Sequence, residues 1–267
     1  MTPSSDDDDP SWTAGEERLW GKFGPEGVPI GELRRMSPAD LVRLVVERNW
    51  TVKMVLKELG QRPRPPDPGA GDALIRAYRE GRLGGWVTAV LLHPLRVDGG
   101  YEVAADILRS AWNEDEGSKA AGVMVAQDPA SACAVFLGVL LDETARSLPR
   151  RCVAIALRGM RDPRIVPTIL EAVRDGRLGP VRGASAIDAD TLDADAIIGW
   201  LGASDRALAT FASELVRRRL AFDDSIGRAV RCAVEAGRIE AIDGERAISE
   251  RQRPPSRVWS ATQRKWG

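Results

Sequence analysis

The 267-residue sequence predicts an all-α protein, and three observations lead to this fold class. Apolar residues recur at helical spacing in nearly every segment, for example over 165–173 and 208–216. No segment alternates apolar and polar residues convincingly, as a half-buried strand does. Helix-breaking steps such as Asp128-Pro129 and Gly179-Pro180 recur at short intervals. We therefore expect short helices of about 9 to 15 residues.

One phrase occurs three times along the chain and predicts a repeat architecture. Its copies are AYREGRL at 77–83, AVRDGRL at 172–178 and AVEAGRI at 233–239. In each copy an apolar helix face ends at a glycine suited to the left-handed position that follows many helices. The copies begin 95 and 61 residues apart, close to three and two periods of about 31 residues. We expect a solenoid of about six short helix pairs over 72–253.

The segment ALRGMRDPRIVPTIL at 156–170 carries a family resemblance. A helix ends, an Asp-Pro turn follows, and a second helix opens with an aliphatic-Val-Pro step. Asp162 is expected to cap this second helix, with Pro163 at its first position. The stretch resembles the HEAT-repeat family in its short-repeat bacterial form. The resemblance implies a right-handed α-solenoid of HEAT-like helix pairs.

The other regions are expected to flank this solenoid in a fixed order. Residues 1–30 form an acidic, partly disordered segment, and 31–60 form a helical hairpin that covers the open solenoid end. The first hairpin helix starts at Ser37-Pro38-Ala39-Asp40, and Thr51 caps the second helix. Residues 61–71 are a Pro/Gly linker, and 254–267 are a basic tail that contains tryptophan.

The overall charge is close to zero and disfavours binding by bulk electrostatics. Thirty-eight Lys and Arg residues face 39 Asp and Glu residues, for a formal charge of -1. This balance weakens the case for nucleic-acid or membrane ligands. No apolar run approaches the roughly 20 residues of a membrane-spanning helix, and no export signal is visible. We expect a cytoplasmic protein, and the strong excess of Arg over Lys suggests a bacterial source.

Two sets of side chains are candidate binding residues. Arg82, Arg177 and Arg238 recur at one position of the repeated phrase. They are expected either to form a basic ridge or to satisfy their own helix ends. The second set consists of tryptophans, whose large apolar area suits a contact with the solenoid or with a partner. They are Trp112 and Trp200, together with Trp259 and Trp266 of the tail.

Catalysis and metal binding find little support. His93 is the single histidine, and the three cysteines are expected to be buried free thiols. The acidic stretch at 188–195 fails the calcium-loop template and is interpreted as helix capping. No phosphate-binding glycine loop and no nucleophile-base pair appears, so we expect no cofactor and no metal.

The sequence therefore favours a non-catalytic scaffold or adaptor that binds a protein or peptide through the solenoid. A first alternative is a DNA-binding regulator that uses the helix-turn-helix-like hairpin at 38–60. Residues 32–64 carry eight basic and four acidic side chains. A second alternative is a HEAT-like enzyme of the DNA glycosylase or bilin lyase type. The glycosylase resemblance implies roles for Trp112, Asp115, Arg150 and Trp200.

Overall fold

The computed structural model describes residues 30–48, 55, 56, 58, 59 and 68–249. These residues form helices, turns and loops and contain no strand, which confirms the all-α prediction. None of their helices is long and apolar enough to cross a membrane. The chain divides into two compact units, 1–132 and 133–267, and each is described by itself.

The first unit is built from short helices that pack against their neighbours in sequence. α3 contacts α5, α5 contacts α6, and α6 and α7 both contact α8. The interior is formed by fully buried aliphatic side chains such as Leu74, Leu91 and Ile107. Its helices are α2 (Ile30–Arg35), α3 (Pro38–Arg48), α5 (Pro68–Arg79), α6 (Gly85–Leu95), α7 (Gly100–Ser110), α8 (Glu114–Gln127) and the first turn of α9 (Pro129–Leu141).

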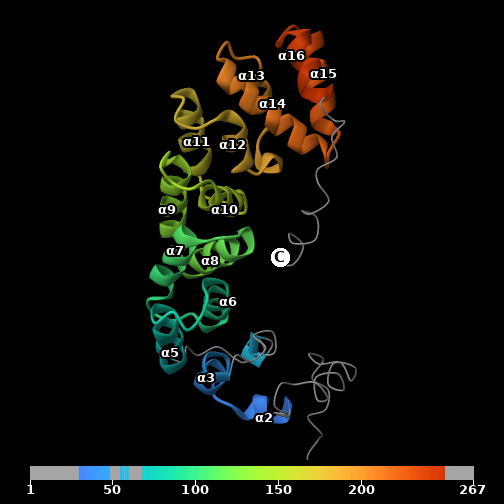
Figure 1. Cartoon of the computed structure of the whole chain (residues 1–267). Coiled ribbons are helices and arrows are strands. Elements are labelled where there is room, and N and C mark those ends of the chain that lie inside the picture. Colours follow the sequence, from blue (N-terminus) through green and yellow to red (C-terminus); the bar gives the residue numbers. More distant parts are fainter. Residues whose placement is uncertain (1–29, 49–54, 57, 60–67, 250–267) are drawn as a thin grey trace, which may run out of the picture. The chain divides into compact units, whose positions relative to one another are not determined.

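The second unit repeats this pattern of short helices (Figure 1). α10 contacts α12, α12 contacts α14, and α14 contacts α16, while α13 packs against α14 and α15. Its elements are the rest of α9, α10 (Ser147–Arg158), α11 (Ile165–Arg174), α12 (Pro180–Ser185), the 3-10 helix η2 (Ala189–Thr191), α13 (Ala194–Leu201), α14 (Arg206–Leu220), α15 (Ser225–Glu235) and α16 (Ala241–Ser249).

Polar caps fix where several helices begin, as the sequence predicts. The Ser37 hydroxyl accepts the Asp40 N–H at 3.1 Å and donates to the Asp40 carboxylate at 2.7 Å. Asp193 accepts the N–H of Ala196 at the start of α13. Such caps satisfy backbone donors that have no partner within the helix. The interpretation of the acidic stretch as capping is therefore confirmed at Asp193.

The repeated glycine adopts the left-handed backbone in all three copies of the phrase. Gly81, Gly176 and Gly237 have φ values of 69°, 73° and 68°. The following backbone folds back on the helix, and the Arg238 N–H donates to the Ala233 carbonyl at 2.8 Å. A side chain at this φ is strained, whereas glycine adopts it freely. The predicted helix-ending role of the phrase is confirmed.

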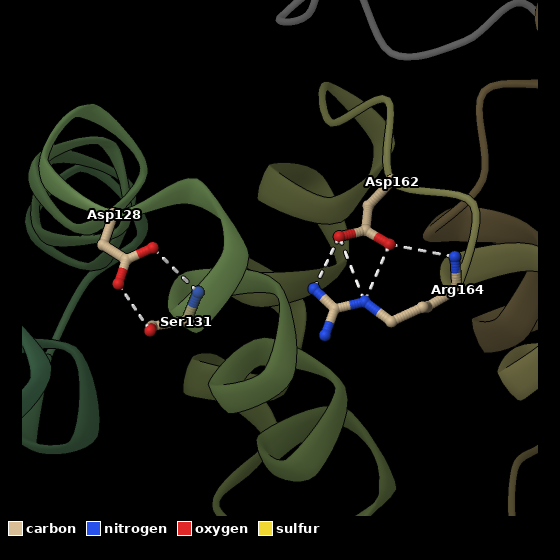
Figure 2. A network of polar contacts seen from close by, with 4 residues as sticks. All are labelled: Asp128, Ser131, Asp162 and Arg164. Carbon is tan, nitrogen blue, oxygen red and sulfur yellow. Dashed lines mark hydrogen bonds and ion pairs between the residues drawn. The ribbon is translucent and has the colours of Figure 1, made fainter.

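Some local expectations differ from the structure. α11 begins at Ile165, so Pro163 lies in the preceding loop and not at the first helical position. Asp162 accepts instead from the backbone N–H of Arg164 at 2.9 Å and from its guanidinium at 2.6 Å. Figure 2 shows this turn and, separately, Asp128 with Ser131 at the start of α9. The Arg164 side chain folds back over Asp162, and α11 begins one residue later, at Ile165.

One cysteine and one helix boundary also depart from expectation. Cys133 and Cys152 are buried as expected, but Cys232 is exposed. α15 buries Ile226, Val230 and Ala233, so position 232 lies on its outer face. α5 begins at Pro68, inside the range expected for the linker. Thr51, residues 1–29 and the basic tail lie outside the described residues.

Candidate binding surface

Positive charge is concentrated on three helices of the second unit, α10, α12 and α14. Together they carry eight arginines and a single acidic residue, Glu214. Helices α11 and α13 carry one arginine and two acids between them. The arginines are Arg150, Arg151, Arg158, Arg182, Arg206, Arg217, Arg218 and Arg219. Because α10 contacts α12 and α12 contacts α14, these positive charges lie on helices that are neighbours in space.

Arg150 of α10 and Arg182 of α12 are a pair of like charges on two helices that contact each other. Arg150 is buried, and its Nε donates to the Leu140 carbonyl oxygen at 3.1 Å. Burial lowers the pKa of the Arg150 guanidinium, and the nearby charge of Arg182 lowers it further. Glu143 and Asp142 act in the opposite direction. Arg182 itself is exposed, so the pair has one fixed member and one that faces solvent.

Arg158 of α10 and Arg218 of α14 also carry like charges, and the charge of Arg218 acts on Arg158. Arg158 is half-buried, and burial lowers the pKa of its guanidinium. The charge of Arg218 lowers this pKa further, whereas Asp188 raises it. Arg158 therefore keeps a positive charge in a partly buried position, where charges are screened less than in water.

Glu214 holds part of this charge in place. Its side chain is buried and accepts hydrogen bonds from the Nε atoms of Arg217 and Arg218, both at 2.8 Å. Burial alone raises the pKa of Glu214, but the hydrogen bonds and charges of the two arginines outweigh it and lower the pKa. One carboxylate therefore orders two guanidiniums and leaves one positive charge in excess.

Two of these arginines, Arg150 and Arg158, lie on α10. Arg150 and Arg158 are eight residues apart, which corresponds to about 12 Å at 1.5 Å per residue. We call Arg150, Arg158, Arg182, Arg217 and Arg218 the arginine surface. Guanidiniums stay charged at neutral pH and present paired N–H donors that match carboxylate or phosphate oxygens. The chemistry that this surface supports is anion recognition.

The predicted arginine ridge does not coincide with the arginine surface. Arg82 pairs with Glu80 at 2.6 Å, and Arg177 pairs with Asp175 at 3.0 Å. Arg238 reaches Asp195 of α13 at 3.2 Å. Each residue lies on the turn after its helix with an acidic partner beside it. The ridge stays a prediction, with its charge offset by these acids.

The predicted tryptophans occupy different surroundings. Trp112 is 77% exposed just before α8, and its backbone N–H donates to the Glu116 carboxylate at 3.0 Å. Trp200 is half-buried and packs on Phe211, with ring centroids 6.0 Å apart. Trp112 is therefore available to a partner, whereas Trp200 contributes to packing. Trp259 and Trp266 lie outside the described residues.

The residues named for a glycosylase-like site have structural partners. Asp115 accepts a hydrogen bond from the indole of Trp86, and Arg150 donates to the end of α9. Among the described residues, no three His, Cys, Asp or Glu side chains gather where they could hold a metal ion.

Comparisons of the chain with family models, with curated proteins and with solved structures find no match. Sequence reasoning missed the arginine surface, because the charge was averaged over all of residues 72–253. The sequence does contain this signal. When charge is summed over each helix, the net charge is more positive for 147–158, 180–185 and 206–220 than for the helices next to them.

Proposed function

We propose that the protein is a non-catalytic scaffold or adaptor that binds a protein or peptide partner. We further propose that its helices form a right-handed solenoid of the HEAT-like kind. Contacts between alternate helices support this arrangement, since α10, α12 and α14 touch in turn, and α13 touches α15. Repeats that contact only their neighbours produce extended binding surfaces of this type.

The arginine surface is the observation that carries the proposal. Its charges come from alternate helices, and three of its arginines have defined partners, Leu140 for Arg150 and Glu214 for Arg217 and Arg218. Ordered donors lose little conformational freedom when a partner binds, which favours affinity. Arginine is also enriched among the residues that dominate binding energy at protein interfaces.

The DNA-binding alternative gains less support from the hairpin. Val55, Glu58 and Leu59 of its second helix are buried. A recognition helix needs exposed polar side chains to reach base edges, and these three positions face the protein interior. α3, the first long hairpin helix, packs against α5, as expected for a hairpin that covers the end of the helical array.

Affinity capture with the full chain tests the proposal. Wild type is compared with Arg182→Glu, which reverses an exposed charge on the arginine surface, and with Arg174→Glu, its matched control on α11. We expect the same partner with wild type and Arg174→Glu, and loss of that partner with Arg182→Glu. Partner recovery that is unaffected by Arg182→Glu would exclude this surface as the binding site.

A further inference from the structure

We infer that the turn before α8 binds a basic peptide segment of a partner protein, with an arginine or lysine side chain lying on Trp112. This site goes beyond the proposed function, because it lies in the first unit and uses none of the arginine surface. Among the described residues, three large apolar side chains are exposed, and Trp112 is the largest of them. They are Trp112, Val181 and Phe222.

The turn holds the backbone of Trp112 in place. The Trp112 N–H donates to the Glu116 carboxylate at 3.0 Å, and the Glu116 N–H donates to the Asn113 side-chain oxygen at 2.8 Å. Ala111 on one side and Glu116 on the other are buried. These contacts close 112–116 into one capped turn, and the 77% exposed indole stands on it. A side chain carried by an ordered backbone loses little conformational freedom when a ligand covers it.

A second tryptophan orients a carboxylate on the same turn. Trp86 lies at the start of α6, and its indole N–H donates to the Asp115 carboxylate. This bond joins two helices that pack against each other, α6 and α8. Trp86 is half-buried, whereas Asp115 is exposed. A carboxylate has about four acceptor sites, so one bond from an indole leaves capacity for a guanidinium or an ammonium group.

The charge of the turn selects a cation as the ligand. Residues 110–118 contain no basic side chain and three acidic ones, Glu114, Asp115 and Glu116. Lys119 offsets one of these charges, and Arg109 is already paired with Asp106 at 2.6 Å. Acidic residues in a first helical turn also stabilise the helix by themselves. The exposed indole has no such role, and it is the feature that indicates a ligand.

A basic side chain satisfies both parts of the site at once. The face of an aromatic ring attracts a cation, and tryptophan does so most strongly. Trp112 and Asp115 are three residues apart, so their Cα atoms are at most about 11 Å from each other. A guanidinium or ammonium group over the indole therefore also gains an ion pair with Asp115. Tryptophan is among the residues that dominate binding energy at protein interfaces, which favours a peptide segment as the source of the cation.

Fluorescence anisotropy with the full chain tests the inference. The probes are three labelled ten-residue peptides in a Gly/Ser background. One carries three arginines, one carries citrulline in their place, and one carries glutamate. Citrulline keeps the planar shape of arginine but has no charge. We expect the arginine peptide to bind at least about tenfold more tightly than the citrulline peptide, and the glutamate peptide to bind most weakly. The affinity of the arginine peptide should fall as salt rises.

Variants locate the binding on the turn. Trp112→Ala should weaken binding of the arginine peptide about tenfold. Asp115→Asn keeps an acceptor for Trp86 and removes the charge, so it should weaken binding about two- to fivefold. The matched controls are Phe222→Ala, which removes another exposed aromatic ring, and Asp72→Asn, which removes another exposed charge of the first unit. Both controls should leave binding unchanged, and circular dichroism checks that each variant is folded.

Four results would overturn the inference. They are equal binding of the arginine and citrulline peptides, no effect of Trp112→Ala, an equal loss in Phe222→Ala, or self-association of the wild type that Trp112→Ala abolishes in sedimentation velocity. In the last case a second copy of the chain covers the indole, and not a partner's basic segment. Partner capture with Arg182→Glu tests the proposed function separately, so the two conclusions stand or fail independently.

Discussion

Gly183 on α12 allows a close helix contact, and its replacement by alanine should destabilise the protein. An added Cβ would lie 2.9 Å from Cγ2 of Val173, 3.2 Å from Cγ2 of Ile169 and 3.4 Å from Cδ2 of Phe211. Favourable carbon contacts lie at about 3.5–4.0 Å, so α12 or its neighbours must shift. Overpacking of this kind costs about 1–3 kcal/mol.

The helix preference of alanine offsets part of this cost. Replacing glycine by alanine inside a helix contributes about 0.5–1 kcal/mol of stability. We therefore expect a net loss of about 1–2 kcal/mol for Gly183→Ala. Gly199 on α13 is the matched control, because it is exposed and an added Cβ meets nothing within 4 Å. Gly199→Ala should gain about 0.5–1 kcal/mol.

Equilibrium urea unfolding followed by circular dichroism measures both changes. The urea concentration at the unfolding midpoint should fall for Gly183→Ala and rise for Gly199→Ala. The slope of the unfolding free energy against urea concentration should stay unchanged in both variants. Stabilisation of similar size in both variants would refute the close packing of α12 against α11 and α14. The result also bears on binding, because Gly183 follows Arg182 directly and a shift of α12 moves that guanidinium.

Three further outcomes follow from individual side chains. The folded-state pKa of Glu214 is lowered, so its carboxylate contributes stability above its unfolded pKa and loses it as pH falls through the folded value. Unfolding titrations should therefore show a weaker loss of stability below about pH 4.5 for Glu214→Gln than for wild type. Asp205 accepts from two backbone N–H groups at the start of α14, so Asp205→Ala should cost about 1 kcal/mol in urea unfolding, and a change below a few tenths would contradict the cap. A thiol reagent should modify exposed Cys232 rapidly in the native protein, whereas Cys133, whose thiol pKa is raised by burial, should react only on unfolding. Equal native rates for the two thiols would contradict their assigned burial.

Local features were predictable because they depend on a few neighbouring residues. The left-handed glycines and the cap at Ser37 follow from backbone sterics and from unsatisfied N–H groups at helix ends. The Asp162 turn was less predictable, because the Arg164 side chain competes for the same carboxylate. Residue preferences for helix ends do not show whether a carboxylate will cap a helix or accept a hydrogen bond from a nearby guanidinium.

The candidate site could not be predicted without knowing which helices contact each other. Arg150 and Arg182 are 32 residues apart in the sequence, and contact between α10 and α12 explains how the charge of Arg182 lowers the pKa of Arg150. Total charge concealed this pattern, because acids in the connecting loops balance arginines on the helices. The exposure of Cys232 likewise depends on which face of α15 is buried.

The choice of arginine over lysine on α10, α12 and α14 determines how the surface can be controlled. Residues 133–249 contain no lysine, so acetylation has no target there. The guanidiniums also keep their charge across the physiological pH range. Lysine acetylation and a change of pH near neutrality therefore leave the charge of this surface unchanged. Amine-directed cross-linkers likewise find no lysine side chain on these three helices. Cross-linking a partner to this surface requires reagents that react with guanidinium or carboxyl groups.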